Sequence, residues 1–375
     1  MNAAQWDRRS LLKSGALAML ASAVPGSVAG AEASAVATPP VTTLPKVDIG
    51  EERIIREVAG LRPFRPSGFV LRAEPLGNKT VIHNYGHGGC GITLSWGTAN
   101  MAVKLALDTS HRVAVVLGCG VIGLTTARLL QDHGFQVTIY AASLPPDTTL
   151  NVAAGLFGVT NIADTDRLSG PFLPQLQEAV RFAHRYFQPF VGQAYGVRWL
   201  TFYIIGDDLP EQPPDYAVTP ELYPLTVYGP REHPFPTTFA ASFPTVIAET
   251  HVFVRRLSEG VIGRGGNIEV RSFAAREEIG SLGEQLIVNC TGLGAKALFD
   301  DPELVPIKGQ LTLLLPQTEI DYCYLDGRND LYMFPRSDGI ILGGSHEDDV
   351  WTTNPNPEIA ERIFAGHSRI IGGMR

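Results

Sequence analysis

The chain has little charge: Asp, Glu, Lys and Arg make up 18% of its 375 residues, against 45% hydrophobic residues. Its formal net charge is −8, and it contains no long run of Lys or Arg. Nucleic-acid binding needs a positive surface to meet the phosphates, so we expect no nucleic-acid partner. General disorder is excluded because the hydrophobic content supports a large core, which predicts one enzyme-sized unit of two subdomains.

Cysteine is scarce, with only four residues in the chain. Cys90 and Cys119 lie inside glycine-rich segments, where a disulfide would tie down backbone that has to stay open to a ligand. We therefore expect mostly free thiols, even in an oxidising compartment where disulfides would be possible.

The sequence also lacks an uninterrupted apolar run of the roughly 20 residues that a membrane-spanning helix needs. Its first apolar run follows Arg8 and Arg9 and is broken at Pro25. An arginine pair before a short run of small and apolar residues is typical of a twin-arginine export signal. We expect a signal at 1–35, a linker at 36–46, no stable membrane anchor, and a periplasmic or secreted protein that the twin-arginine machinery exports already folded.

A turn of the form G-x-G-x-x-G occupies residues 118–123. A strand is predicted before it at 112–117, with a helix at about 122–133 and a second strand at 136–140. In this βαβ context the first glycine permits a tight turn, the second admits a pyrophosphate, and the third lets helix pack on strand. The segment therefore indicates a dinucleotide site with phosphate at the helix N-terminus, without choosing between NAD and FAD.

The second predicted strand lacks the acidic residue that usually holds the adenosine ribose, because Ala141, Ala142 and Ser143 stand there. The ribose contact must come from elsewhere, or cofactor binding is weaker than usual. An NAD-dependent enzyme would need this acid, so its absence disfavours NAD.

A second glycine-rich stretch, "VIHNYGHGGCGITLSWGTA", covers residues 81–99. So much glycine indicates backbone held close to a ligand. A metal site at His83 and His87 is disfavoured, because their four-residue spacing helps only on a helix and the intervening and following glycines oppose one. Further along, helices are predicted at 175–188 and 245–258, and strands within 196–205, 282–295 and 339–345.

Several of these segments together resemble the D-amino-acid oxidase family: "GLRPFRPSGFVLRAE", "TVIHNYGHGGCGITLSWGTA", "VVLGCGVIGLTTARLL", "LIVNCTGLGA" and "LYMFPRSDGIILGG". In that family the dinucleotide turn comes first, whereas here the closing segments, residues 47–107, precede it. The order is similar to a circular permutation, with the old ends joined through "LALDTSHRV" and new ends before Gly60 and after Arg375.

The resemblance implies an α/β fold with a discontinuous Rossmann-like FAD-binding domain at 47–170 and 245–300. A smaller substrate domain with a mixed, largely antiparallel sheet is expected at 171–244 and 301–375. FAD is the implied cofactor, and the second glycine-rich stretch would place a helix N-terminus beside the flavin, where its dipole favours reduction. The residues implied at FAD are Gly118, Gly120, Val121, Ile122, Gly123, Ala142, Ser143, Thr149, Ala154, Gly155, Leu156, Val270, Thr291, Gly292, Gly88, Gly91, Ile92 and Thr93.

For the substrate, the resemblance implies that Arg62 grips the α-carboxylate of a D-amino acid and that the Tyr332 hydroxyl also contacts it. The carbonyl of Gly89 would accept from the amine, whereas Arg65 is expected to be structural. The implied reaction is hydride transfer to flavin N5, with the imine hydrolysing to a 2-oxo acid and ammonia. Oxygen, giving hydrogen peroxide, or another electron acceptor would complete the cycle.

Two departures from the family bear on specificity. The resemblance places Arg328 where mammalian members have a second tyrosine and His346 where aspartate-specific relatives have an arginine. Two basic residues at the pocket rim would favour an acidic substrate side chain. A flavin amine dehydrogenase, a glycine/sarcosine-type oxidase, and a flavin-binding protein without turnover stay open as alternatives. The oligomeric state does not follow from the sequence.

Overall fold

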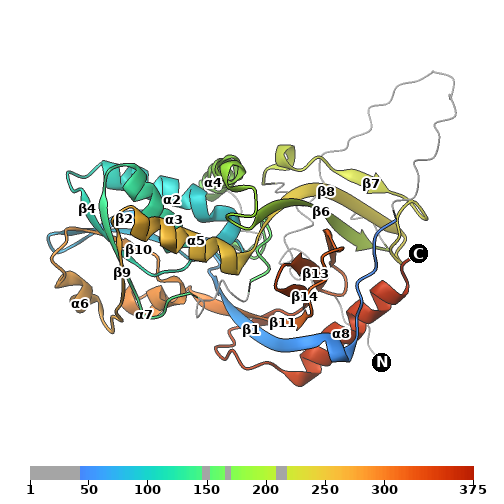
Figure 1. The fold of residues 1–375 in the computed structure, drawn as a ribbon. Helices are drawn as coiled ribbons and strands as arrows, with labels where there is room; N and C mark the ends of the chain where they lie inside the picture. Colours follow the sequence, from blue (N-terminus) through green and yellow to red (C-terminus); the bar gives the residue numbers. More distant parts are fainter. Residues whose placement is uncertain (1–42, 146–152, 165–169, 208–217) are drawn as a thin grey trace, which may run out of the picture.

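The computed structural model describes residues 43–145, 153–164, 170–207 and 218–375. Two sheets lie toward opposite ends of the molecule in Figure 1, with the smaller one on the left. The expected export signal at 1–35 lies outside the described residues, as do most of the linker and Thr149.

The smaller sheet is the predicted dinucleotide-binding unit. Its βαβ start consists of β4 (Val113–Leu117), α3 (Val121–Asp132) and β5 (Gln136–Ala141). The six strands run in the order β2-β3-β10-β4-β5-β9, all parallel except for the antiparallel pair β2 and β3. The other four strands are β2 (Val70–Leu76), β3 (Lys79–Tyr85), β9 (Asn267–Val270) and β10 (Leu286–Asn289).

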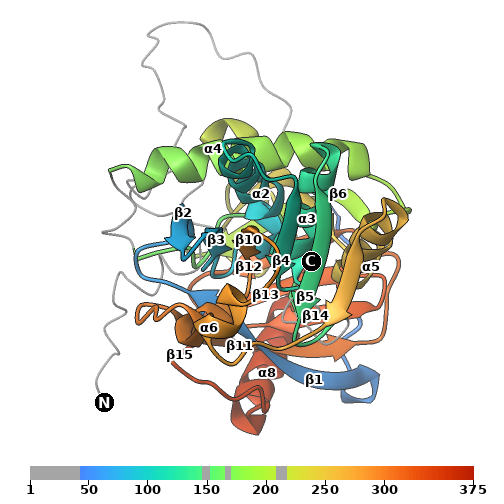
Figure 2. The same cartoon turned by 90° about the vertical axis from the view of Figure 1, so that its left-hand side faces the viewer.

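Both faces of this sheet are covered, which explains its apolar strands. Ala114 and Val116 face the core beneath α2 (Gly91–Leu107), α3 and α5 (Thr250–Gly263), while Val115 packs toward α6 (Arg276–Gly280) and α7 (Ala295–Leu298). A further helix, α4 (Phe172–Phe187), packs on α2 and crosses the top of Figure 2.

The larger sheet has nine strands in the order β1-β11-β14-β13-β12-β6-β8-β7, with β15 also paired to β11. Only the pair β12 and β6 is parallel, so the sheet is mixed and largely antiparallel, as predicted. The helix α8 (Pro357–Gly372) contributes to the core on one face. The strands are β1 (Ile54–Phe64), β6 (Val197–Gly206), β7 (Thr226–Tyr228), β8 (Phe239–Ala248), β11 (Val305–Leu314), β12 (Tyr322–Asp326), β13 (Leu331–Arg336), β14 (Gly339–Gly343) and β15 (Glu347–Asp348).

Two expectations differ from the structure. The helix predicted at 245–258 begins only at Thr250, because the apolar run before it continues the strand β8 to Ala248. The strand β1 pairs antiparallel with β11, so it belongs to the larger sheet and not to the cofactor-binding part where the expected boundary at residue 47 put it.

Residues near the two ends of the described chain come together at the side chain of Tyr322. The Tyr322 hydroxyl donates to the Pro45 carbonyl over 2.9 Å and lies 3.8 Å from the Met374 sulfur. Pro45, near the start of the described residues, and Met374, near their end, are therefore neighbours in the fold.

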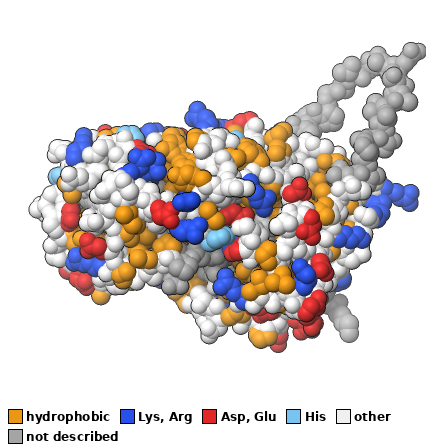
Figure 3. All heavy atoms as spheres, viewed as in Figure 1, with side chains coloured by type: hydrophobic (Ala, Val, Ile, Leu, Met, Phe, Trp, Pro, Cys, Tyr) orange, Lys and Arg blue, Asp and Glu red, His pale blue; other side chains and the backbone are white. Residues whose placement is uncertain are grey.

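All four cysteines are unpaired and buried, in agreement with the sequence-based expectation. Burial raises the pKa of Cys90 and Cys290 to about 12 and that of Cys119 to about 11. No helix among the described residues is both long enough and apolar enough to span a membrane. On the face drawn in Figure 3, acidic and basic side chains are interspersed.

Candidate active site

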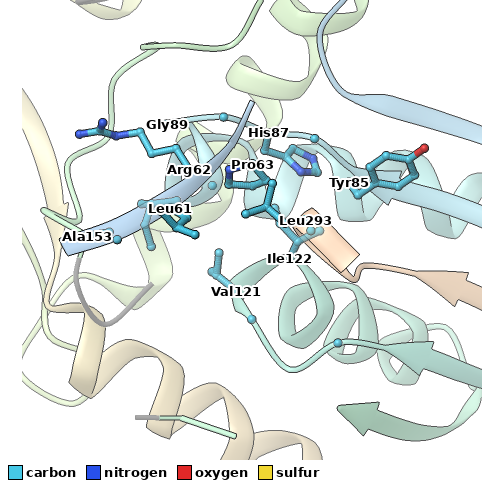
Figure 4. A pocket seen from close by; sticks show the side chains of 18 of the residues that line it. Leu61, Arg62, Pro63, Tyr85, His87, Gly89, Val121, Ile122, Ala153 and Leu293 are labelled. Atoms are coloured by element: carbon cyan, nitrogen blue, oxygen red, sulfur yellow. The ribbon is translucent and has the colours of Figure 1, made fainter. Parts of the chain in front are cut away.

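A cavity of about 690 Å³ lies between the two sheets and is lined by residues of both. Figure 4 shows the segment of β1 that carries Leu61, Arg62 and Pro63 opposite the turn that carries Val121 and Ile122. The cavity therefore brings the predicted dinucleotide turn and the predicted substrate-binding arginine to one place.

Each glycine of the dinucleotide turn has a separate structural reason. Gly118 has a φ of +107°, and a Cβ there would lie 2.4 Å from the Cys290 carbonyl oxygen. A Cβ on Gly123 would lie 2.0 Å from the Gly118 carbonyl oxygen, so this glycine lets α3 pack on its strand. A Cβ on Gly120 would meet no protein atom within 4 Å, and Gly120 lines the cavity. Gly120 therefore leaves room for a ligand, as the motif predicts.

The second glycine-rich stretch reaches the same cavity. A Cβ on Gly88 would lie 1.7 Å from the Asn161 carbonyl oxygen, and the Gly89 N–H donates to that oxygen over 3.2 Å. The helix α2 then begins at Gly91, whose Cβ would lie 3.7 Å from Val121 at the start of α3. Close backbone packing therefore explains Gly88, whereas a Cβ on Gly91 would make only an ordinary contact.

The starts of α2 and α3 fit FAD. Neither has a side-chain cap, so N–H groups at both N-termini remain for a negatively charged ligand. The FAD pyrophosphate and the flavin of a reduced cofactor both carry negative charge, which two adjacent positive helix ends would stabilise. The residues predicted at FAD that line the cavity are Gly88, Gly91, Ile92, Gly118, Gly120, Val121, Ile122, Ala142, Ser143, Ala154, Gly155, Leu156, Thr291 and Gly292.

Three predicted cofactor residues do not line the cavity. Gly123 has the packing role described above, and Thr93 is buried with its hydroxyl bonded to the backbone of Gly158. Val270 is 68% exposed, while the next residue, Arg271, lines the cavity.

Arg271 stands near the position of the missing ribose acid. Its backbone N–H donates to the Ala141 carbonyl, at the end of β5, over 2.8 Å. Its guanidinium lies 5.1 Å from the ring centre of Tyr140 and 4.8 Å from that of Phe273. Sequence reasoning missed this residue, because one arginine after a short exposed strand carries no motif. It offers donors on the wall where Ala142 has none.

His83 and His87 have different hydrogen-bonding partners and do not share a site. His83 lies 3.2 Å from a Glu74 oxygen and 3.0 Å from the Asn289 amide, and burial lowers the pKa of its imidazole although Glu74 opposes this. The Asn289 oxygen in turn accepts from the Thr291 hydroxyl over 2.7 Å. His83 therefore supports a cavity residue through Asn289. His87 instead lies 3.1 Å from the Thr98 hydroxyl.

At the other end of the cavity, Arg62 Nη2 donates to the Tyr332 hydroxyl over 3.1 Å, and Nη1 lies 3.5 Å from the Ser345 carbonyl oxygen. Tyr332 is 9% exposed, and burial raises its pKa although Arg62 opposes this. Its hydroxyl therefore remains a hydrogen-bond donor near neutral pH. Arg65, by contrast, pairs with Asp301 and Glu303 at 2.8 Å each, which agrees with a structural role.

Arg328 and His346, the two basic residues expected near the substrate, lie in different places. Arg328 is exposed and does not line the cavity, whereas His346 does. His346 Nδ1 lies 2.8 Å from Asp330 Oδ2, and its Nε2 lies 3.0 Å from the Asn161 amide nitrogen. Asp330 and Asn161 also line the cavity, and sequence reasoning missed both.

This fold and site define a two-domain enzyme that uses a dinucleotide cofactor. The family described as FAD dependent oxidoreductase matches residues 38–105 and 114–372, and the chain belongs to this family. It is an FAD-dependent oxidoreductase.

Individual relatives are consistent with this assignment. A D-amino-acid oxidase of Rubrobacter xylanophilus is 32% identical over 271 residues, which are 70% of this chain and 78% of the relative. A human D-aspartate oxidase is 28% identical, with 69% of this chain and 75% of the relative covered. A glycine oxidase structure from Bacillus cereus matches with a TM-score of 0.53 at 15% identity, over 69% of this chain and 78% of that one; it supports the fold alone.

Proposed function

We propose that the protein oxidises D-amino acids to 2-oxo acids and releases ammonia, with oxygen as the electron acceptor and hydrogen peroxide as the second product. The observation that carries this proposal is the hydrogen bond between Arg62 and Tyr332 on the wall of the cavity that the dinucleotide turn also lines. The similarity to D-amino-acid oxidases supports the same substrate class.

The residues of the chain would bind and orient the amino acid. Arg62 offers a planar guanidinium that binds a carboxylate through two hydrogen bonds, and the Tyr332 hydroxyl donates a third. The carbonyl oxygen of Gly89, at the start of α2, would accept from a neutral α-amine. FAD, when bound, supplies the oxidant that takes the α-hydrogen together with its electron pair.

Apolar side chains would keep water from this end of the cavity. Phe202, Phe243, Leu325 and Phe334 line it and are buried. An apolar lining that excludes water strengthens the attraction between Arg62 and a carboxylate, because less solvent screens the charges. The fixed α-carboxylate and α-amine would then determine which hydrogen faces the oxidant, and therefore which enantiomer reacts.

An anaerobic absorption experiment tests the proposal. The purified protein should show an oxidised-flavin spectrum that bleaches when a D-amino-acid mixture is added and persists with the L-enantiomers. An Arg62→Ala variant should keep its flavin and lose the bleaching. A flavin spectrum that ignores every D-amino acid, or that bleaches with L-amino acids alone, would overturn the proposed substrate class.

The electron acceptor needs a separate measurement. When air is admitted after bleaching, the flavin spectrum should return within seconds and hydrogen peroxide should appear in equal amount to the 2-oxo acid. Slow return without peroxide, together with rapid return on adding an artificial quinone, would instead assign a dehydrogenase.

We also propose that the chain is a circular permutant of its relatives. The alignments to single relatives cover about 70% of the chain. Residues 114–372, without the segment 38–105, make up roughly the same fraction of the chain. The meeting of Pro45 and Met374 at Tyr322 supports such an arrangement, because permutation requires neighbouring ends. A chain that joins residue 375 to residue 47 through a short linker and opens between 107 and 112 should fold and bind FAD. Failure to fold would count against this proposal.

Export through the twin-arginine pathway is proposed from the sequence pattern at Arg8 and Arg9 alone. In a bacterial host, the protein should appear in the periplasmic fraction with FAD bound, and an Arg8→Lys, Arg9→Lys double variant should stay in the cytoplasm. Equal fractionation of the two forms would overturn this proposal.

A further inference from the structure

Asp330 is the one acidic side chain among the described residues that line the cavity. It directly precedes β13 and lies two positions before Tyr332, which lines the same cavity. Its φ of +50° is unusual for a residue other than glycine, although Asp tolerates it, and such positions are often found at functional sites. A negative charge therefore lies on the same wall as the carboxylate-binding pair.

Only one oxygen of this carboxylate has a partner among the described residues. Asp330 Oδ2 is bonded to His346, whereas Oδ1 is buried and has no hydrogen-bond partner there. A buried acceptor that is left unpaired is destabilising, and an ionised one is more so. The site therefore favours a hydrogen-bond donor brought by a ligand.

A second unpaired acceptor lies on the other side of His346. Asn161 is 5% exposed, its amide nitrogen lies 3.0 Å from His346 Nε2, and its Oδ1 is buried without a partner among the described residues. Its φ of +48° also lies in the left-handed region, and its backbone oxygen accepts a hydrogen bond from the Gly89 N–H. His346 thus fixes two acceptors, Asp330 Oδ1 and Asn161 Oδ1, at one cavity wall.

The charges along this wall change from positive to negative. The guanidinium of Arg62 and the carboxylate of Asp330 both act on Tyr332, and they shift the pKa of its hydroxyl in opposite directions. The apolar side chains of Leu325 and Phe334 also line the cavity. A molecule with a carboxylate at one end, a cation at the other and methylene groups between them would have a partner for each of its parts on this lining.

On the basis of the proposed function, we infer that the preferred substrates are D-amino acids with a cationic side chain, such as D-lysine and D-arginine. Arg62 holds the α-carboxylate, and Asp330 Oδ1 receives the side-chain ammonium or guanidinium, with Asn161 Oδ1 as a second acceptor. This reverses the acidic preference expected from Arg328 and His346, because Arg328 does not line the cavity and His346 is paired with an acid.

Rate comparisons on the FAD-bound wild type test the inference first. D-Lysine and D-norleucine carry the same linear chain and differ by the terminal ammonium, so their kcat/KM ratio isolates its contribution. We expect a ratio of about 10 or more in favour of D-lysine, the size typical of one charge-assisted contact, and poor turnover of D-aspartate and D-glutamate. Equal rates for D-lysine and D-norleucine, or faster turnover of the acidic substrates, would overturn the inference.

An Asp330→Asn variant should show a ratio of kcat/KM for D-lysine to kcat/KM for D-norleucine that is about tenfold or more below the wild-type ratio. Asp330→Glu, which retains the charge, should keep part of the preference. Asp321→Asn, at an exposed aspartate outside the cavity, is the matched control and should change neither value. An equal loss for both substrates in Asp330→Asn would assign Asp330 to the α-amine and refute the side-chain contact.

Two further readouts separate the possible failures. Flavin content and melting temperature show whether a variant has lost its fold, and the wild-type comparison of D-lysine with D-norleucine needs no variant at all. If the wild-type flavin responds to no D-amino acid, the proposed function itself fails. If it responds without preference for cations, only this inference fails.

Discussion

Arg62 and Tyr332 contact each other across two intervening strands of the larger sheet. Their hydrogen bond of 3.1 Å joins β1 to β13, while β11 and β14 lie between them. Each intervening strand has a glycine beneath the contact. A Cβ on Gly309 would lie 2.5 Å from Arg62 Nη2, and one on Gly343 would lie 1.9 Å from the Tyr332 ring. The absence of two side chains therefore makes the proposed carboxylate site possible.

Replacing one of these glycines should damage substrate binding and spare the cofactor. Gly343→Ala forces the Tyr332 ring away from Arg62, so we expect KM for D-amino acids to rise about tenfold or more, the cost of one hydrogen bond to a charged group. Bound FAD should remain at the wild-type level. Gly372→Ala, whose Cβ would meet no atom within 4 Å, is the control. An unchanged KM in Gly343→Ala would show that Tyr332 does not contact the substrate.

The dinucleotide turn allows a test that separates folding from cofactor binding. An added Cβ at Gly120 meets no protein atom, so Gly120→Ala should fold with a circular dichroism spectrum like that of the wild type. The methyl group would project into the space assigned to the pyrophosphate, and FAD affinity should fall by about tenfold or more. Titration of the apoprotein with FAD, followed by flavin fluorescence, measures this. Gly263→Ala serves as the control at a glycine outside the cavity, and equal FAD affinity in both variants would contradict the assignment.

Arg271 should contribute to FAD binding in place of the missing acid. Its guanidinium is held against Tyr140 and Phe273, and it faces the end of the cavity where Ala142 offers no contact. We expect Arg271→Ala to weaken FAD binding by about tenfold, since one hydrogen bond or cation–π contact of about 1–2 kcal/mol is lost. Arg264→Ala, which removes an exposed arginine paired with Asp132, should leave FAD affinity unchanged. Equal affinity in both variants would remove Arg271 from the cofactor site.

Two buried histidines should make the fold sensitive to acid. Burial lowers the pKa of His87 to about 3 and that of His367 to about 4, from an ordinary value of 6.5. Between pH 6.5 and these values the unfolded chain binds protons that the folded chain does not, so the free energy of unfolding falls as the pH falls. For His367 the loss is on the order of 3 kcal/mol by pH 4.

Urea unfolding at several pH values checks this pH dependence. His367→Gln cannot titrate and should therefore show a weaker loss of stability between pH 6.5 and 4 than the wild type. Its stability at pH 7.5 is also expected to fall, because the contacts to Tyr324 and Gly343 change. Parallel pH profiles for the two proteins would contradict the neutral buried state of His367.

The backbone of the dinucleotide turn was predictable from the sequence, whereas several side-chain partners around the cavity were not. Gly118, Gly120 and Gly123 follow from local structure alone, because a strand, a turn and a helix succeed one another here. No local pattern reveals that the Thr93 hydroxyl bonds to the backbone of Gly158, so its placement at the cofactor stays a prediction. The position of Arg271 on the cavity wall depends on how the chain leaves β9, which the sequence does not specify.

The pair of Asp330 and His346 shows the same limit at longer range. These residues lie 16 positions apart, and their contact depends on a left-handed backbone at Asp330. The sequence indicated only that His346 is a basic residue at the pocket, because its pairing with Asp330 is not visible in the sequence. The pairing of Arg62 with Tyr332 followed from family resemblance, whereas the two glycines that permit it emerged only from the register of the strands.

The buried thiols have a consequence for an enzyme that would generate an oxidant. Cys119 and Cys290 line the cavity in which hydrogen peroxide would form if oxygen is the acceptor. Peroxide attacks the thiolate, and burial raises the pKa of these two groups to about 11 and about 12, so almost none is ionised at neutral pH. If oxygen is the acceptor, these two sulfurs would therefore meet peroxide as thiols, which react slowly, and the enzyme should survive many turnovers without oxidising Cys119 and Cys290.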